Sequence, residues 1–547
     1  MKKYGFLICL LIVSVLAAGC NSASGPINNP SDTNGPVFGG QYTYGITGEP
    51  TTLNPIFSTD SATSGITNLV YDSLLTIDEN LEVASELATD WTISEDNKVL
   101  TFNLKQDVKW HDGEKFTAED VKYTYDVVMH DDYTGVRAKD LKYVEKVEAT
   151  SEYVVKIYLK QVDAPLMTKL AGSALGILPK HIFENTAVKD LKEHVNSWNP
   201  IGTGPYKFVE YKPGQHTILT ANTEYYGDGP YIETIMVKTY QDTQVLLAAF
   251  ENGDVDYIDE IPVNDIEHVK SSLKDTVEFK EGPQNRYNYI GLKQNHPILG
   301  DLKVRQALMY ALDRDTIINT VFKGYGTVVN SHGVPFSWAY SDDVNKYEQN
   351  KDKAISLLEE AGWDKVGSDG IRVNNKGDKL TFVMVSATGN EDISNVISMI
   401  DEQWKAIGID VVVEYYERSV LFSKYLDVGK FEAYMWGWNL GVDPDSYLMF
   451  HSDCALDENG VLQGFNDVEY KNDDIDTWLV DGRKTFDIEQ RKAIYAKISK
   501  KLNEELPYVF LYTNNLVKGM NNKVKNVVWS PLEPIKINKW YIDPAFH

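Results

Sequence analysis

The feature that most constrains the fold is a strand–helix–strand pattern in residues 379–416. The segments "KLTFVMVS" (379–386) and "IDVVVEYY" (409–416) are rich in β-branched and aromatic residues, as strands are. A helical stretch between them ends near Ile407 and Gly408. A helix that joins two strands in this order forms a βαβ unit, whose strands are parallel. We therefore expect an α/β fold with a parallel sheet in at least part of the chain.

Further segments carry the periodicity of helices and strands. A capping box predicts one helix start, because Asp120 follows Thr117 by three residues. Gly362 is expected to end another helix, because glycine adopts the left-handed conformation found after a last turn. The predicted segments are strands at 98–105 and 153–160 and helices at 116–129, 301–322 and 351–363.

Length and charge limit the class of protein. A chain of 547 residues is too long for one hydrophobic core, so two or three domains are expected. Its formal net charge is −27, and no basic run offsets it. Such a surface repels phosphate backbones. We therefore expect no nucleic-acid partner.

The N-terminus reads as an export signal. Lys2 and Lys3 precede an apolar run that is too short to span a membrane, so residues 1–19 are predicted to be a signal peptide. The stretch Leu16-Ala17-Ala18-Gly19-Cys20 resembles a bacterial lipobox, which implies cleavage before Cys20 and lipid attachment to its sulfur. Ordinary cleavage beside an incidental cysteine is the alternative. With a lipid on Cys20, the protein would be anchored to the outer face of the cell membrane.

Residues 20–37 are expected to be a flexible tether between that anchor and the folded part. They are rich in Asn, Ser, Gly and Pro and show no apolar periodicity. Beyond Cys9 and Cys20, the chain has only Cys454, so no internal disulfide is expected. His451 lies close to Cys454, but these two residues alone do not make a zinc site.

The common local motifs of enzymes are missing from the sequence. There is no G-x-S-x-G, H-E-x-x-H, G-x-x-x-x-G-K-[ST] or G-x-G-x-x-G pattern. His111 beside Asp112 suggests either a metal or proton relay or a bend, and the following glycine favours the bend. We expect a protein that is not an enzyme and that has no cofactor, no metal site and no catalytic residues. A catalytic triad assembled from residues distant in sequence carries no local motif.

The stretch "FEAYMWGWNLGVDPDSY" (431–447) is the most unusual local sequence. Trp436 and Trp438 flank a glycine, and Asp443-Pro444-Asp445 follows. Three interpretations fit these residues: a core strand that ends in a turn, an acidic metal site, or an aromatic platform for a ligand. If the strand alternates, one tryptophan is expected to face the core.

Several segments together resemble the family 5 extracellular solute-binding proteins, which are the peptide-binding components of ABC importers. The resemblance implies two lobes joined by a hinge of two crossing strands, in the type II periplasmic-binding-protein-like fold of the large three-subdomain class. The matching segments occur in the family's order and are "EPTTLNPIFSTD" (49–60), residues 69–121, "IGTGPYKF" (201–208), "DLKVRQALMYALDRDTI" (301–317), "AGW" (361–363) and "ELPYVFLY" (505–512).

The resemblance also implies a domain layout and a function. The hinge strands would lie near 287–293 and 505–515. Peptide would be captured between the lobes and delivered to the membrane subunits of an ABC permease, by a protein that acts as a monomer. The implied parts are lobe I at 38–74, 203–292 and 516–547, an inserted subdomain at 75–202, and lobe II at 293–515.

In family peptide binders, the ligand backbone pairs with two short segments, one in each lobe. Carried over to this chain, the first segment is Thr59, Asp60 and Ser61, and the alternative role of Asp60 is to cap a turn. The second is Gly437, Trp438 and Asn439, next to Trp436. A glycine suits a place where another backbone approaches closely.

Two departures from the family pattern bear on the ligand. Relatives that clamp an α-amino group often carry an aspartate where this chain has Gly441, and Asp443 is either a substitute anchor or a turn residue. Some relatives carry an arginine for the peptide carboxylate where this chain has Met435. These departures favour longer peptides, or another ligand such as a nickel chelate, haem or an oligosaccharide stacked on the tryptophans. A secreted peptide hydrolase is the third hypothesis.

Overall fold

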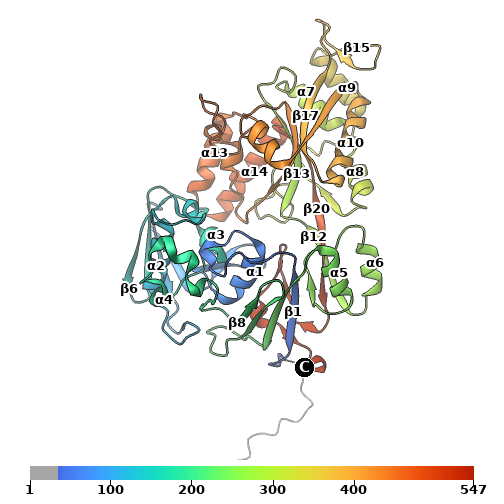
Figure 1. Cartoon of the computed structure of the whole chain (residues 1–547). Coiled ribbons are helices and arrows are strands. Elements are labelled where there is room, and N and C mark those ends of the chain that lie inside the picture. The colour runs from blue at the N-terminus through green and yellow to red at the C-terminus, as the bar shows by residue number, and fades with distance from the viewer. Residues whose placement is uncertain (1–34) are drawn as a thin grey trace, which may run out of the picture. The chain divides into compact units, whose positions relative to one another are not determined.

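The computed structural model describes residues 35–547 (Figure 1). The predicted signal peptide (1–19), Cys20 and most of the predicted tether (20–37) lie outside the described residues. Within residues 35–547, none of the helices combines the length and the apolar character that a membrane span requires.

A twelve-stranded mixed sheet runs through the described part of the chain. Its main path has the strand order β18-β17-β19-β13-β20-β11-β1-β10-β9-β8, and β12 and β14 pair with β20 beside this path. Its strands are β1 Gln41–Ile46, β8 Tyr206–Lys212, β9 His216–Ala221, β10 Thr234–Thr239, β11 Tyr257–Ile258, β12 Val277–Pro283, β13 Arg286–Leu292, β14 Gly326–Val328, β17 Thr381–Ala387, β18 Asp410–Tyr416, β19 Ala433–Asn439 and β20 Tyr508–Asn521.

Strand β20 joins the two halves of this sheet. The first part of its 14 residues pairs with β13 and β14, and the second part pairs with β12 and β11. Figure 1 shows β20 running from the β13 side to the β12 side. The chain crosses a second time between β12 and β13, through Gln284 and Asn285. The two halves of the sheet are therefore connected by two backbone crossings.

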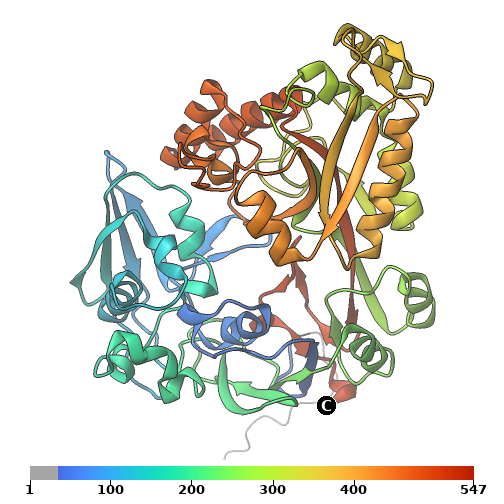
Figure 2. The ribbon, with the colours of Figure 1, turned by 45° about the horizontal axis from the view of Figure 1, so that its top comes forward.

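The predicted βαβ unit is confirmed. Strands β17 and β18 are parallel, from the pair Thr381 and Asp410 to the pair Ala387 and Tyr416. Helix α10 (Glu391–Lys405) joins them and lies alongside the strands (Figure 2). Its buried side chains recur at helical spacing, so one face of the helix covers the sheet.

The predicted helix over 301–322 is wrong in its continuity. The structure divides it into α7 (Leu302–Ala311) and α8 (Arg314–Val321). Leu312 adopts an extended conformation, and the Asp313 side chain accepts a hydrogen bond from the backbone N–H of Thr316. Asp313 therefore caps a new helix, which a pattern of apolar residues alone does not reveal.

The other predicted helices and strands are confirmed. Helix α2 (Ala118–Met129) begins with the predicted capping box of Thr117 and Asp120. Helix α9 (Lys351–Glu360) is followed by Gly362, whose φ is +90°. The predicted strands at 98–105 and 153–160 are β5 (Val99–Leu104) and β7 (Val154–Leu159), which pair in a four-stranded sheet with β4 (Ala88–Ile93) and β6 (Val144–Ser151).

The remaining elements are short, apart from two helices near the C-terminus. The helices are α1 Ser61–Val70, α3 Leu166–Leu170, α4 Lys180–Phe183, α5 Thr243–Glu251, α6 Ile266–Ser272, α11 Arg418–Leu421, α12 Tyr447–Phe450, α13 Asp473–Lys484 and α14 Ile488–Glu505. The strands form two-stranded sheets: β2 Leu75–Ile77 with β3 Val83–Ser85, β15 Lys365–Val366 with β16 Arg372–Val373, β21 Val524–Lys525 with β24 Tyr541–Ile542, and β22 Val528–Trp529 with β23 Pro534–Ile535.

Separate hydrophobic cores lie on the two sides of the crossings. One core is built only from residues between Tyr287 and Tyr512. The other two are built from residues before Phe279 and after Tyr512, with Val517 and Met520 of β20 in them. A chain with separate cores on either side of two strand crossings has two lobes.

Candidate functional site

Strand β19 has a free edge where the sequence places a ligand segment. On one side, β13 pairs with it along its whole length, from Ala433 to Asn439. On the other side, β17 pairs only with Ala433 and Tyr434. Within residues 35–547, no strand pairs with residues 435–439 on that side. This part of the backbone is therefore open to another extended chain.

The edge lies at the carboxyl ends of the parallel strands. Strands β17, β18 and β19 run in the same direction, and β13 runs antiparallel to β19. The chain after β17 leads to β18 on one side, and the chain after β19 leads to β20 on the other side, so the direction of the connections switches between β17 and β19. Ligands of open α/β sheets bind at such a switch point, outside the carboxyl ends of the strands.

Gly437 leaves room for a neighbouring side chain. A Cβ atom built at this position would lie 2.4 Å from Nη2 and 2.7 Å from Cζ of Arg286. The Arg286 guanidinium therefore packs flat on Gly437, and its Nη1 donates a hydrogen bond to the exposed Asn439, with 3.1 Å to Oδ1. The structure gives Gly437 a reason within the chain, in addition to the ligand approach expected from the sequence.

The two tryptophans lie on one face of β19, because they are two residues apart in a strand. Both side chains are half-buried. The expectation that one tryptophan faces the core and the other does not is therefore wrong. The Trp438 ring stacks on Tyr289 at 6.3 Å between centroids and contacts Phe465 at 5.3 Å. The Trp436 ring packs on Phe422 at 4.9 Å. These rings form a partly exposed aromatic surface beside the free edge.

The lobe I segment lies before and at the start of helix α1. Thr59 and Ser61 are exposed. The Asp60 carboxylate accepts hydrogen bonds from the Thr63 backbone N–H (2.7 Å) and the Thr51 hydroxyl (2.6 Å). Burial alone would raise the pKa of Asp60, but these hydrogen bonds outweigh burial and lower it. The carboxylate of Asp60 is thus engaged as a helix cap.

Two side chains from the region after helix α2 hold this segment in place. Tyr133 donates a hydrogen bond to the carbonyl of Ile56, and Arg137 Nη2 donates one to the carbonyl of Ser58 at 2.8 Å. Within residues 35–547, the backbone of Thr59 makes no hydrogen bond of its own. Its N–H and C=O are therefore available to a ligand.

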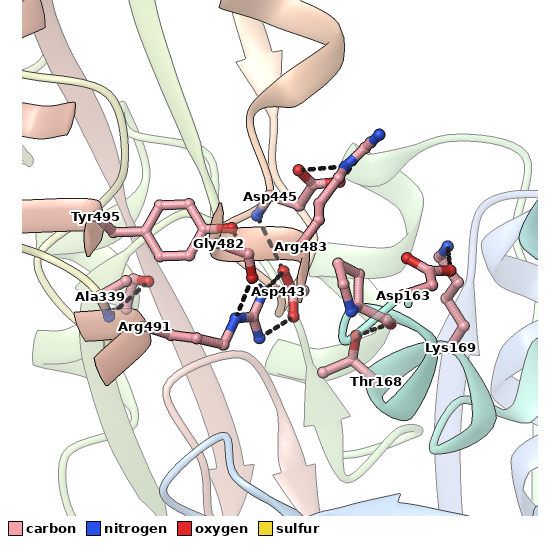
Figure 3. A network of polar contacts seen from close by, with 12 residues as sticks. Asp163, Thr168, Lys169, Ala339, Asp443, Asp445, Gly482, Arg483, Arg491 and Tyr495 are labelled. Atoms are coloured by element: carbon pink, nitrogen blue, oxygen red, sulfur yellow. Dashed lines mark hydrogen bonds and ion pairs between the residues drawn. The ribbon is translucent and has the colours of Figure 1, made fainter. Parts of the chain in front are cut away.

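Asp443 and Asp445 belong to two ion pairs with helices α13 and α14 (Figure 3). Both carboxylate oxygens of Asp443 accept from Arg491, each at 2.8 Å, and one also accepts from the Asp445 N–H at 3.0 Å. Asp445 pairs with Arg483, with 2.7 Å from Nη2 to Oδ2. The geometry is that of a bidentate pair and a turn, which matches the structural alternative for Asp443.

The Asp445–Arg483 pair lies beside a contact between the lobes. The backbone N–H of Ala164, which precedes helix α3, donates a hydrogen bond to the carbonyl of Arg483 at 2.8 Å. Asp163, which pairs with Lys169 at 3.3 Å, lies on the facing side in Figure 3. The two lobes are thus in contact at this point in the described conformation.

Metal ligands do not gather in the part of the chain that the structure describes. No group of three or more His, Cys, Asp or Glu side chains in residues 35–547 is placed to hold a metal ion. His111 accepts a hydrogen bond from the N–H of Gly202 at 3.2 Å and contacts the carbonyl of Gly204 at 2.9 Å. Burial lowers the pKa of His111 to about 4. His111 therefore stabilises a bend through its contacts with the backbone of Gly202 and Gly204.

A buried carboxyl group lies behind the aromatic surface. The Tyr434 hydroxyl donates a hydrogen bond to Asp467 at 2.8 Å and contacts the Tyr289 hydroxyl at 3.1 Å. Lys293 pairs with Glu469 at 2.6 Å and donates to the backbone carbonyl of Asp467. Burial raises the pKa of Asp467 to about 7.

The raised pKa of Asp467 predicts a pH-dependent stability. An unfolded aspartate titrates near pH 4, so between about pH 4 and 7 the folded state holds a proton that the unfolded state has released. Stability therefore falls as pH rises through this window. Asp467→Asn, which cannot ionise, is expected to gain up to about 4 kcal/mol on wild type across the window. Urea denaturation at several pH values measures this gain, and the exposed Asp364→Asn is the control. A gain that does not grow with pH would contradict the prediction.

Sequence reasoning missed Arg286, Phe465 and Tyr289. Their roles depend on partners from other strands and loops, such as the pairing of β13 with β19. The alternation of aromatic residues in "RYNYIGL" was a signal for a strand, but nothing in it indicated which strand would lie beside it.

Comparisons with known proteins agree with this arrangement. Residues 82–458 match the family model for bacterial extracellular solute-binding proteins, family 5 Middle. The oligopeptide-binding protein AppA of Bacillus subtilis is 33% identical over 544 residues, which are 98% of each chain. The solved structure of that protein in complex with a nonapeptide matches with a TM-score of 0.70 and covers 93% of this chain and 99% of the other.

A second solved structure has a different ligand. NikZ from Campylobacter jejuni in complex with Ni(L-His) is 27% identical, with a TM-score of 0.71, and covers 92% of this chain and 99% of that chain. The predicted two-lobe type II fold is confirmed by these structural neighbours. Two lobes, two strand crossings and a match that spans most of the sequence lead to one conclusion: the chain belongs to the bacterial extracellular solute-binding proteins of family 5.

Proposed function

We propose that this chain is the substrate-binding lipoprotein of an ABC transporter, which captures extracellular oligopeptides between its two lobes and delivers them to a membrane permease. The free edge of β19 over residues 435–439 carries this proposal. A relative of similar length is an oligopeptide-binding protein by name, and its solved structure holds a nonapeptide.

A free strand edge suits ligands of variable sequence. An extended peptide that joins a sheet uses its backbone N–H and C=O groups, which are the same for every side chain. Residues 435–439 provide roughly 15 Å of edge, enough for a few ligand residues. Larger side chains of the ligand would lie against the aromatic surface of Trp436, Trp438 and Phe465. Of these three, Phe465 is 48% exposed.

We assign the second contact to the lobe I segment. Thr59, Asp60 and Ser61 would meet the ligand through backbone groups, because the Asp60 carboxylate is already occupied. Gly437, Trp438 and Asn439 would meet it from lobe II, next to Trp436. The role of Asp443 as an anchor for the peptide amine stays a prediction. Both of its carboxylate oxygens already accept hydrogen bonds from Arg491, so the amine would have to share them.

Closure of the lobes would follow from the two strand crossings. Few residues need to change conformation when two rigid lobes move about two strands. The proposed division is lobe I at 38–74, 203–292 and 516–547, a subdomain inserted at 75–202, and lobe II at 293–515. Separate hydrophobic cores support two lobes, but the core of the second lobe includes residues 287–292, so we move that boundary to the crossing at Gln284 and Asn285.

The site of action follows from the family and the N-terminal sequence. The family is extracellular by description. A lipid on Cys20, with residues 20–37 as a tether, would hold the protein beside its permease. We propose a monomer without a cofactor, whose partners are the peptide, the permease subunits and the membrane.

Incubation of the purified protein with a mixed peptide pool tests the proposal. We expect intact peptides to stay with the protein through gel filtration and to be recovered without new fragments. Fragments that appear with time would show hydrolysis and would sink the transport proposal. A control incubation without the protein excludes spontaneous cleavage.

A further inference from the structure

Arg286 differs from the other buried or half-buried arginines in its partners. Arg137, Arg372, Arg483 and Arg491 form ion pairs with carboxylates. Arg305 and Arg314 instead donate to several backbone carbonyls. Arg286 is half-buried, and its one hydrogen bond within residues 35–547 goes to the neutral amide oxygen of Asn439. Most of its N–H donors are unused.

A second arginine lies on the opposite face of β19. Arg418 stacks on the ring of Trp436, with 5.4 Å from Cζ to the centroid, and forms no ion pair within residues 35–547. Trp436 and Gly437 are consecutive residues of a strand, so Arg418 and Arg286 lie on its two faces. Burial and the charge of Arg418 both lower the pKa of Arg286. The two guanidinium groups repel each other, and an anion nearby would relieve this repulsion.

A buried hydroxyl group near Arg286 also lacks a partner. Tyr512 is 1% exposed, and its hydroxyl makes no hydrogen bond within residues 35–547. Burial raises the pKa of Tyr512, while the charge of Arg286 lowers it, so the two groups are within electrostatic range. The Tyr512 hydroxyl is therefore a second polar group, within electrostatic range of Arg286, that has no partner among the described residues.

We propose that Arg286, with Arg418 on the opposite face, binds a carboxylate of the ligand at the end of the free β19 edge. The inference rests on the proposed function and deepens it. Guanidinium groups recognise carboxylates through paired N–H donors. The positive charge would come from β13 and α11, while Met435 occupies the position of the arginine that some relatives carry. The carboxylate is either the C-terminus of the peptide or an acidic side chain.

Three pools of mixed-sequence nonapeptides without Asp or Glu in the variable positions distinguish these sources. The first pool has a free C-terminus, the second a carboxamide, and the third a carboxamide with one added Asp. Retention on the protein is measured by filtration and mass spectrometry. We expect the wild type to retain the first or the third pool at least about tenfold better than the second. Better retention of the first pool indicates that the site binds the peptide C-terminus. Better retention of the third pool indicates that it binds an acidic side chain.

Variants connect the preference to Arg286. Arg286→Met is expected to abolish the preference, and Arg286→Lys to keep part of it, because lysine retains the charge without the paired donors. Lys365→Met removes an equal charge from the exposed β15 and is expected to keep the preference. Circular dichroism checks that each variant folds.

The outcomes separate the two proposals. Equal retention of all three pools by the wild type would overturn the carboxylate site and leave peptide binding intact. A preference that survives in Arg286→Met would also overturn it. If Arg286→Met does not fold, two other measurements replace it. Arg418→Gln is expected to weaken the preference for a carboxylate, and high salt is expected to abolish that preference in the wild type. Retention of no pool would overturn the proposed function itself.

Discussion

Asp443→Asn is expected to lower the free energy of unfolding by about 3–5 kcal/mol. The Asp443 and Arg491 side chains are 10% and 8% exposed, and they share two hydrogen bonds of 2.8 Å. The substitution leaves the Arg491 guanidinium buried without a counter-charge. A second partner, the carbonyl of Gly482 at 3.0 Å, compensates only in part. Urea denaturation near pH 7 measures the loss.

An exposed ion pair provides the matched control for this substitution. The Lys346 and Asp342 side chains are 46% and 75% exposed. Asp342→Asn is therefore expected to cost less than about 1 kcal/mol. If Asp443→Asn costs no more than this control, the buried pair does not hold the loop after β19, and our account of Asp443 is wrong.

Peptides with free and acetylated amino termini separate the two roles of Asp443. The sequence-based prediction is that Asp443→Asn weakens binding of free-amine peptides more than that of acetylated ones. An equal loss for both would make Asp443 a structural residue only. Stability and binding are measured separately. The stabilising role of the ion pair can therefore be correct even if Asp443 does not bind the peptide amine.

Trp438→Ala is expected to weaken peptide binding by about 30-fold while the protein stays folded. The ring stacks on Tyr289 and contacts Phe465 beside the free edge, so it offers the ligand a rigid apolar surface. Since Trp438 is half-buried, its loss also removes some packing, and a decrease in Tm of a few degrees is expected. Titration with the nonapeptide pool measures the affinity.

A similar tryptophan outside the proposed site is the control for lost packing. Trp198 is 37% exposed and stacks on Tyr211 at 5.4 Å between centroids. Trp198→Ala should lower Tm by a similar amount and leave the affinity unchanged. Unfolding of Trp438→Ala, or an affinity equal to that of the control, would remove Trp438 from the site.

The parts of the fold that were predictable depend on local patterns. The βαβ unit of residues 379–416 follows from two runs of β-branched residues around an amphipathic helix, and the start of α2 follows from its capping box. The break between α7 and α8 was not predictable from apolar spacing. It depends on the extended conformation of Leu312 and on the hydrogen bond by which Asp313 caps the next helix.

The candidate site shows the same limit more strongly. The sequence drew attention to Trp438 and Gly437, but it did not reveal that Arg286 packs on Gly437, because that contact needs β13 beside β19. The free edge of β19 exists because β17 diverges after Val385, which is a property of three strands together. Likewise, Arg491 reaches Asp443 from a helix 48 residues away in sequence.

Native mass spectrometry of the protein purified without added ligand tests the central claim most directly. If the free β19 edge binds peptide backbone, the protein should carry peptides of mixed sequence, seen as a series of masses that disappears on unfolding and refolding. A single defined species, such as a nickel chelate, haem or an oligosaccharide, would contradict the account.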